Sequence, residues 1–559
     1  MPKFILIDHS LRDLGGHHYP YAQTVLSAAQ RLGWQPVLAV NRRFSQHASL
    51  PCQWRVHSLF AHESYSRYTL DTQARAAPDS ADATTSRRQV VGRWWAARVR
   101  RRRAADFARD FARLFALEPV AAGDLVFLAT MSELDLWGLT AFLEESGVGL
   151  DCDWHLQFHF GLFRGREPDY AAQSRAAELM RNSLGGALRQ SGRQRLHFHC
   201  TTEQLTTQYR HLGIAQFATL PYPVHELFQP RAQPAAAAPL RIACLGHSRR
   251  EKGYGLLPQL LRALWSDWFG PGRAQLVLQT HHGRQRRSLE GLVTALTPSG
   301  TAPPPALDFA GFPLPLAGYA ELLCGADVGL MLYDSTRYYA RCSGVLLEML
   351  CAGVPVLVPA GGWLAAQIEA TNQLYLDEVA AGTGRAATPL AADGVIAVPA
   401  GAQSLLLSCQ WRADVGVGEY LRLGFTAQDS SGAGWPPARV ILGARGAAMP
   451  VRCLLRLPAG CRRVRITAHN AWQQAEPPAA GFEWTLLTAA VPMGALGLTV
   501  AAASEIPRLL QDVLEHAGHY RHCARTHAAA CARAHSGLQV LAGLGMRAAP
   551  SIAAEPPTT

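Results

Sequence analysis

The stretch YYARCSGVLLEMLCAGVPVLVPAGGW, Tyr338 to Trp363, decides the fold of this 559-residue chain. Its second half indicates a buried helix, a glycine turn and a short apolar strand, which is the alternation found where helices cover a parallel sheet. One glutamate, Glu348, stands inside that apolar run. The role of this carboxylate is the first question that the sequence raises.

Length and composition limit the class of protein. A chain of this length exceeds one hydrophobic core and predicts about three or four domains. No apolar run reaches the roughly 20 residues that a membrane-spanning helix needs. The first ten residues turn polar at Asp8 without a signal-peptide pattern, so we expect a cytoplasmic protein. The 12 scattered cysteines contain no C-x-x-C pair and predict reduced thiols, with no structural metal.

The chain is basic, with a formal charge of +11. This indicates an anionic partner, and nucleotide diphosphates, nucleic acid and acidic lipid all satisfy it. Much of the excess lies between Arg87 and Phe115, a segment whose apolar residues recur at helical spacing on one face, namely Phe107, Phe111, Leu114 and Phe115. One interpretation is a helix that rests peripherally on an anionic membrane. The other is a solvated basic helix whose aromatic side chains pack on their own domain.

Strand-like and helix-like segments alternate through two consecutive halves. The first half opens with the apolar strand FILID and the turn LRDLGGHHY, followed by a helical run from Ala22 to Leu32. The second half has the strands LRIACLG, AQLVLQT, ALDFAGF, ADVGLMLYD and VPVLVPA. Each series predicts a parallel sheet covered on both faces. We place the halves at residues 1–229 and 240–394, joined by a proline- and alanine-rich linker at 230–239.

The pattern of predicted secondary structure changes after Gly394. Short β-rich segments such as SLLLSCQW, EYLRLGFTA and RRVRITAHN are separated by glycine, proline and aspartate turns, which is typical of a β-sandwich. We assign residues 395–500 to this inserted sandwich, 501–536 to a C-terminal helical segment and 537–559 to a disordered tail.

Two interpretations of the insertion stay open. It is either a structural appendage or a module that holds a polymeric glycan on tryptophan side chains. The candidate tryptophans are Trp411, Trp435, Trp472 and Trp484. Trp411 and Trp484 lie in strands and are expected in the core, whereas Trp435 and Trp472 lie in turn-like segments.

Candidate ligand-binding groups follow the strands of the second half. In LGHSRREKGYGLL a strand ends at Gly246, and the loop after it carries Arg249 and Lys252. Ligands of open α/β sheets bind at the carboxyl ends of strands, where these cations would neutralise a diphosphate.

The helix in the opening stretch supplies a second binding feature. Ser343 is its expected N-cap, so the N–H groups of Gly344 and Val345 point outward at a helix start and favour an anion. Glu348 lies little more than one turn further along, where its carboxylate would accept hydrogen bonds from ribose hydroxyls. We therefore predict that Glu348 holds the sugar of a nucleotide.

These segments together carry a family resemblance. The succession LGHSRREKG, DFAGF, YAELLCGADVGLMLYD and SGVLLEMLCAGVPVLVPAGG resembles the donor-binding half of GT-B glycosyltransferases, most closely glycosyltransferase family 4. The first half resembles the acceptor half, with GGHH as its glycine loop. The resemblance covers Met1 to about Asp377 and the last helix, but not the sandwich. It implies an α/β fold of GT-B type, with two Rossmann-like domains facing a cleft.

The resemblance also implies an activity. The chain would be a hexosyltransferase-like enzyme of polysaccharide biosynthesis, which transfers a sugar from a nucleotide-diphosphate-sugar donor to a glycan or lipid-linked acceptor. Transfer would retain the anomeric configuration and require neither a metal nor another cofactor, and nucleic acid is not an implied partner. Two alternatives stay open: a non-catalytic GT-B protein that binds glycans or nucleotide sugars, and a GT-B epimerase or phosphorylase.

Carried over residue by residue, the resemblance assigns Lys252 to the diphosphate-binding lysine of the family and Glu348 to the second glutamate of its E-x(7)-E motif. The first glutamate of that motif falls at Ala340, and Arg341 is the nearest polar replacement. His247 stands where the family usually has arginine, so Arg249 is expected to substitute.

The first half contributes the remaining candidates. His159, at the end of WHLQFHF, resembles the histidine that faces the donor sugar, and Gly15 and Gly16 resemble the loop that contacts donor phosphate and acceptor. Each has a plainer interpretation, a core histidine or a tight turn. The predicted catalytic residues are thus His159, Arg249 and Lys252. The predicted donor-binding residues are Gly16, Gly246, Arg341, Ser343, Gly344, Val345 and Glu348.

Overall fold

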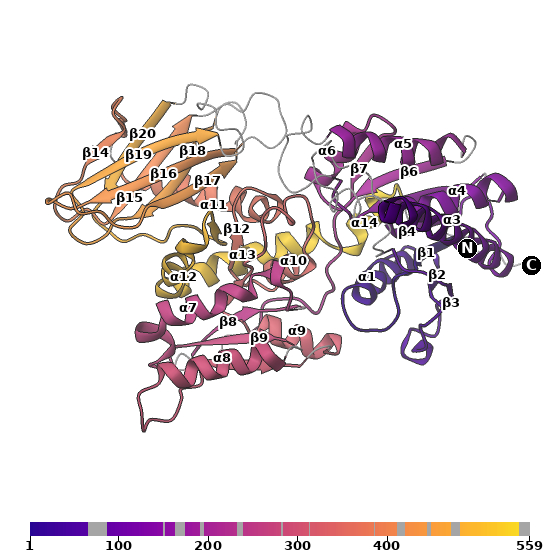
Figure 1. Cartoon of the computed structure of the whole chain (residues 1–559), viewed down its shortest axis with the longest axis horizontal. Helices are drawn as coiled ribbons and strands as arrows, with labels where there is room; N and C mark the ends of the chain where they lie inside the picture. Colours follow the sequence, from indigo (N-terminus) through magenta and orange to yellow (C-terminus); the bar gives the residue numbers. More distant parts are fainter. Residues whose placement is uncertain are drawn as a thin grey trace, which may run out of the picture.

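The structure is a computed structural model. It describes residues 1–64, 87–148, 151–162, 174–190, 195–231, 239–246, 248–280, 283–311, 314–384, 386–410, 420–443, 449–470 and 481–546. Two parallel sheets, each with its own helices, lie in the two halves of the chain, and a pair of antiparallel sheets lies beyond the second (Figure 1).

The first domain is built on a seven-stranded parallel sheet in the order β3-β2-β1-β4-β5-β6-β7. Its strands are β1 (Lys3–Asp8), β2 (Gln35–Asn41), β3 (Arg55–Phe60), β4 (Leu125–Met131), β5 (Asp153–Phe158), β6 (Arg195–Cys200) and β7 (Phe217–Thr219). Its helices are α1 (His18–Arg31), α3 (Arg87–Leu117), α4 (Glu133–Ser146), α5 (Ser174–Gln190) and α6 (Glu203–His211), and η1 (His47–Ser49) is a short turn. In β1, Phe4 and Leu6 enter one core while Ile5 and Ile7 enter the other, which is why the strand reads as an unbroken apolar run.

The basic helix α3 packs its aromatic face inside the first domain. Phe107, Phe111, Leu114 and Phe115 are all buried in the core that α3 shares with α4 and the sheet. Trp95, by contrast, is 56% exposed. The aromatic face of α3 therefore packs on its own domain, as the second interpretation of this segment expects, and contact of its remaining surface with a membrane stays a prediction. No helix in the described parts of the chain is long and apolar enough to cross a membrane.

The second domain contains a six-stranded parallel sheet in the order β10-β9-β8-β11-β12-β21. Its strands are β8 (Leu240–Cys244), β9 (Ala274–Gln279), β10 (Leu307–Ala310), β11 (Val328–Leu330), β12 (Val356–Pro359) and β21 (Gly497–Val500). Its helices are α7 (Leu257–Ala263), α8 (Gly283–Leu296), α9 (Leu316–Cys324), α10 (Gly344–Cys351) and α11 (Trp363–Gly382), with short 3₁₀ turns at η2 (Arg250–Lys252) and η3 (Tyr254–Leu256) and a π-helical turn at η4 (Trp265–Phe269). Two Rossmann-like domains that share a cleft confirm the predicted α/β fold of GT-B type.

The insertion is a sandwich of two four-stranded antiparallel sheets, ordered β13-β20-β15-β18 and β14-β19-β16-β17. Its strands are β13 (Thr388–Pro389), β14 (Val395–Ala397), β15 (Ser404–Gln410), β16 (Tyr420–Gln428), β17 (Ala438–Gly443), β18 (Val451–Arg456), β19 (Arg463–Asn470) and β20 (Gly481–Leu487). Trp435 and Trp484 are both partly buried against its core. Trp435 is therefore not the exposed platform that its turn-like segment suggested, while Trp411 and Trp472 lie outside the described residues.

Three predicted boundaries shift in the structure. The sandwich begins before residue 395, because β13 already pairs within it. It ends before residue 497, because β21 (residues 497–500) pairs in parallel with β12 of the second domain. The insertion thus interrupts the Rossmann-like sheet itself rather than the connection to the last helix. The predicted disordered tail is wrong for residues 537–543, which form α14 (Gly537–Gly543).

The C-terminal helices connect the two domains. The turn η5 (Ala503–Glu505) leads into α12 (Ile506–Glu515), α13 (Ala517–Ala534) and α14, and these run from the second domain back to the first, where α14 packs on α1 (Figure 1). At the crossing, the N–H of Val224 donates to the carbonyl of His535 at 2.8 Å. The Nδ1 atom of His535 lies 2.9 Å from the carbonyl oxygen of Tyr222. These contacts attach the C-terminal helices to the first domain, so the C-terminal segment links the two domains.

Candidate active site in the cleft between the domains

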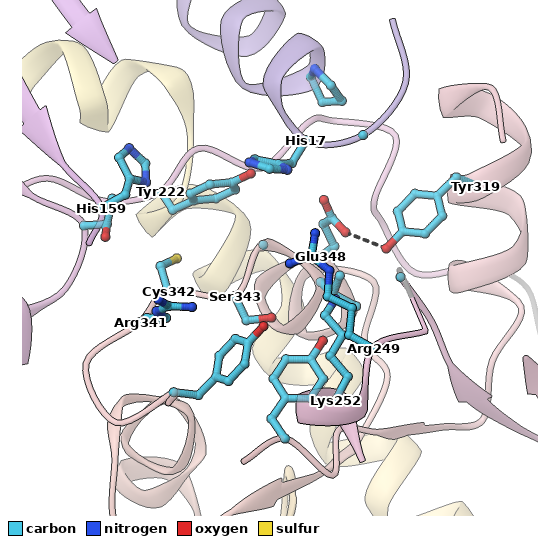
Figure 2. A pocket seen from close by; sticks show the side chains of 18 of the residues that line it. His17, His159, Tyr222, Arg249, Lys252, Tyr319, Arg341, Cys342, Ser343 and Glu348 are labelled. Atoms are coloured by element: carbon cyan, nitrogen blue, oxygen red, sulfur yellow. Dashed lines mark hydrogen bonds between the residues drawn. The ribbon is translucent and has the colours of Figure 1, made fainter. Parts of the chain in front are cut away.

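A cavity of about 730 Å³ opens between the two domains (Figure 2). Its walls come from the loops after β1 and β5 in the first domain and from the loop after β8, helix α9 and the start of α10 in the second. It brings together every residue that the sequence proposed for the site: Gly16, His159, Gly246, Arg249, Lys252, Arg341, Ser343, Gly344, Val345 and Glu348. Their convergence follows from the sheets, because parallel strands present their carboxyl ends at one edge.

The loop after β8 positions Lys252. Gly246 has a φ of 88°, and its N–H donates to Oε1 of Gln279 at 2.9 Å. A Cβ at position 246 would lie 2.7 Å from Nζ of Lys252, so a larger residue there would displace the ammonium group, and the positive φ itself favours glycine. The same Nζ lies 5.2 Å from the ring centroid of Tyr333. Burial lowers the pKa of Lys252, partly offset by the nearby Tyr338.

Arg249 lies at the outer side of the same loop. Its side chain is 57% exposed, and Nη1 is 3.8 Å from a carboxylate oxygen of Glu251. An exposed pair at this distance contributes little to stability, so the guanidinium can turn toward a ligand at small cost. His247 stands where the resembled family usually has the arginine that Arg249 is expected to replace. His247 lies outside the described residues.

Helix α10 begins where the sequence predicted. Ser343 has an extended backbone, and its Oγ accepts a hydrogen bond from the N–H of Leu346 at 3.4 Å. Gly344 and Val345, the first residues of the helix, line the cavity. The positive end of the helix dipole therefore faces the same space as Lys252, which suits an anion bound between them.

Glu348 is buried at the wall of the cavity, with 8% of its surface exposed. The hydroxyl of Tyr319, on α9, donates to its Oε2 at 3.0 Å (Figure 2). Burial raises the pKa of Glu348 to about 7, against the opposing effects of the Tyr319 hydrogen bond and the charge of Lys252. Near neutral pH this carboxyl therefore exists in both protonation states.

Sequence reasoning missed Tyr319, although it lies in the quoted segment YAELLC. It missed Tyr222 and His17 as well, which also line the cavity. The motif GGHH does draw attention to His17. However, the sequence cannot assign a function to a histidine beside a glycine turn, because it does not show which residues surround the side chain. Burial holds the pKa of His17 well below its usual value, so its imidazole is neutral in the cleft.

His159 faces the cavity from the end of β5. Its Nε2 lies 2.6 Å from the carbonyl oxygen of Ala129. Because a carbonyl only accepts, Nε2 carries the proton and Nδ1 keeps its lone pair. Burial lowers the pKa of His159 to about 4, so the ring is neutral at physiological pH. Its position in the cavity distinguishes it from His155, which is buried. Nδ1 of His155 lies 2.9 Å from Nε2 of His199 on the neighbouring strand.

The position of the missing motif glutamate does not face the cavity. Ala340 is 5% exposed and packs in the core of the first domain. The hydroxyl of Thr202 donates to its carbonyl oxygen at 2.7 Å, which links the two domains. Arg341, the next residue, lines the cavity instead. Within the described ranges, no cluster of three or more His, Cys, Asp or Glu side chains could hold a metal ion.

No family model and no curated protein matches the chain. Solved structures with a similar arrangement include a trehalose-6-phosphate synthase, OtsA, at 14% identity, which covers 69% of this chain and 91% of that one with a TM-score of 0.43. An alpha,alpha-trehalose-phosphate synthase (UDP-forming) from Burkholderia vietnamiensis has 12% identity, 66% and 86% coverage and a TM-score of 0.41. WaaG, a glycosyltransferase involved in lipopolysaccharide biosynthesis, has 14% identity, 65% and 83% coverage and a TM-score of 0.37. At these identities the likeness concerns the fold alone.

Proposed function

We propose that this chain is a glycosyltransferase that transfers a sugar from a nucleotide-diphosphate-sugar donor to a glycan or lipid-linked acceptor. One observation carries the proposal: Lys252, the start of α10 and buried Glu348 line a single cavity between two Rossmann-like domains. A cation and a helix N-terminus suit a diphosphate, and a carboxylate one turn along the helix suits the two hydroxyls of a ribose.

In the proposed reaction the bond from the anomeric carbon to the diphosphate oxygen breaks while the acceptor oxygen bonds to the same face of that carbon, so the anomeric configuration is retained. The proton of the acceptor hydroxyl passes to the departing phosphate oxygen. Lys252, Arg249 and the N–H groups of Gly344 and Val345 stabilise the negative charge that develops on the diphosphate. The proposed reaction does not use a metal ion. His159 accepts a hydrogen bond from a sugar hydroxyl through its unprotonated Nδ1, which fixes the sugar above the leaving group.

Radiolabelled nucleotide sugars test the proposal. The base is chosen first by thermal shift with UDP, GDP and ADP, because a ligand at about 100 times its dissociation constant stabilises a protein by about 2.7 kcal/mol. Transfer or donor hydrolysis supports the enzyme. Binding without turnover favours the non-catalytic alternative, whereas interconversion or phosphorolysis of the sugar favours the epimerase or phosphorylase.

The proposal extends to where the protein lies in the cell and to its contact with a membrane. We also propose a cytoplasmic location and a contact of α3 with an anionic membrane, which its arginines and the exposed Trp95 would form. Sedimentation with vesicles of phosphatidylcholine alone and with added phosphatidylserine measures it. Equal binding to both would contradict the contact.

The role of Glu348 predicts a loss of nucleotide affinity in Glu348→Gln. A charge-assisted hydrogen bond is worth about 1.5–3 kcal/mol, so the dissociation constant for the nucleoside diphosphate should rise about tenfold to a hundredfold. Glutamine keeps the size of the side chain and still accepts from Tyr319, which limits any change in packing. Calorimetric titration measures the constant, and an unchanged value would exclude Glu348 from the binding site.

The raised pKa of Glu348 predicts a pH dependence of the same affinity. With a pKa of about 7, the carboxyl is mostly protonated at about pH 6 and mostly ionised at about pH 8. Because the ionised form accepts the stronger hydrogen bonds, affinity should rise by about tenfold over that interval. Glu348→Gln is the control: it shares every other titrating group, including those of the nucleotide. A slope that persists in this variant would assign the pH dependence elsewhere.

A further inference from the structure

Among the residues that the structure describes, the charged groups that line the cavity do not balance. Apart from Glu348, the lining carboxylate is Glu63, which forms an ion pair with Arg12. The lining cations are Arg249, Lys252 and Arg341. A donor diphosphate at the start of α10 would be served by the first two cations together with the helix N-terminus. The charge of Arg341 is left over.

Arg341 has fewer described partners than the other two lining cations: Lys252 also lacks an ion pair, but its Nζ lies 5.2 Å from the ring centroid of Tyr333. No hydrogen bond or ion pair joins the guanidinium of Arg341 to any other residue that the structure describes, whereas Arg249 lies 3.8 Å from the carboxylate of Glu251. Arginine stays charged at all physiological pH values, so a partly buried guanidinium without a counterion is costly unless a ligand supplies one. Its planar donors match a carboxylate through two parallel hydrogen bonds.

The backbone directs Arg341 into the cleft. The hydrogen bond from Thr202 to the carbonyl of Ala340 holds the preceding peptide against the first domain, and the Ala340 side chain is buried there. Figure 2 shows Arg341 beside Cys342 on the same side of Ser343 as His159, while Arg249 and Lys252 lie on the opposite side. The leftover charge therefore lies away from the phosphate-binding cations, toward the domain that faces the transferred sugar and the acceptor.

We infer that Arg341 binds the carboxylate of an acidic sugar, so that the enzyme acts on a hexuronate, either as the transferred sugar or as the acceptor. The inference rests on the proposed function and adds the substrate class. Position 341 then carries a positive charge because the group it faces is anionic. A neutral hexose would leave the guanidinium without a counterion in the closed site.

The donor arm of the test compares binding of UDP-glucose with UDP-glucuronate, and of GDP-mannose with GDP-mannuronate, by calorimetry without acceptor. The pair with the preferred base is used. The acceptor arm titrates a glucuronate-terminated disaccharide and its glucose-terminated counterpart into protein saturated with the nucleoside diphosphate. We expect the wild-type protein to prefer the acidic member of one arm by about tenfold or more. The arm that shows the preference identifies which substrate carries the carboxylate.

Three variants assign that preference to Arg341. Arg341→Ala should abolish it, and Arg341→Lys should restore part of it, because lysine keeps the charge but not the planar fork. Arg262→Ala removes an equal charge from the exposed side of α7, outside the cavity, and should keep the full preference. No preference in either arm, or a preference that survives in Arg341→Ala, would overturn the inference. Nucleoside diphosphate binding by the same samples separates the two proposals: if it is intact, only the assignment of Arg341 fails, and if it is absent, the proposed function fails as well.

Discussion

Replacing Lys252 with alanine is expected to lower sugar transfer by about 100-fold or more, which is the usual cost of removing one donor from a charge-stabilising site. Nζ of Lys252 lies 2.7 Å from the place that a Cβ of residue 246 would take, at the wall shared with the start of α10. No other described lysine lines the cavity, so no second ammonium group would replace it. The measurements are kcat/KM for transfer and the dissociation constant of the nucleoside diphosphate.

Two companion variants make this result interpretable. Lys252→Arg keeps the charge but places a larger planar group beside Gly246, where the space is narrow, and should recover only part of the rate. Arg262→Ala should transfer sugar at the wild-type rate. The melting temperature of Lys252→Ala should stay near that of the wild type, because a loop lysine contributes little to the core. Wild-type turnover in Lys252→Ala would remove this residue from the proposed site.

The largest effect on stability is expected from Gly497→Ala, at the point where the chain returns from the sandwich to the second domain. Gly497 has a φ of 124°, and a Cβ there would lie 1.8 Å from the carbonyl oxygen of Val356 on the neighbouring strand. Neither backbone can move without breaking the pairing of β21 with β12. We expect a loss of more than about 4 kcal/mol in the free energy of unfolding, which places this change among the exceptional ones.

Gly432→Ala is the matched control for this prediction. Gly432 also has a positive φ, of 85°, but nothing lies within 4 Å of a Cβ there. Its replacement carries the conformational penalty alone, about 1–2 kcal/mol. The difference between the two variants in urea denaturation isolates the clash at β12. Equal losses would show that β21 is not held in the second sheet as the structure describes.

Much of the candidate site could be predicted because its residues follow strands in a regular order. The apolar strand before Gly246 and the helix after Ser343 are recognisable from local patterns, and parallel strands bring their following loops to one edge. That is sufficient to bring Lys252 and Glu348 into one cavity. The partners of these residues could not be predicted in the same way. Tyr319 meets Glu348 from another helix, and no local pattern encodes the rotation that aims its hydroxyl at the carboxylate.

The features that the sequence left open have a common physical reason. The basic segment that forms α3 is amphipathic, and the same pattern serves a helix on a membrane or a helix on its own core. The segment GLTV of β21 looks like another strand of the sandwich, because a short apolar strand carries no mark of the sheet that it joins. Likewise, Ala340 and Arg341 are adjacent, and only the contact of Ala340 with Thr202 decides which of them faces the cleft.

By itself, the sequence determined the two alternating α/β halves, the β-rich insertion and the loops that carry the charged groups, because hydrophobic period and turn residues act over a few neighbours. The tertiary structure alone decided which sheet β21 completes, where the aromatic face of α3 is buried, how Tyr319 meets Glu348, and that His17 and Arg341 line the same cavity. These outcomes depend on packing between residues far apart in the chain. That packing is set by the sum of many contacts, none of which is visible in a local pattern.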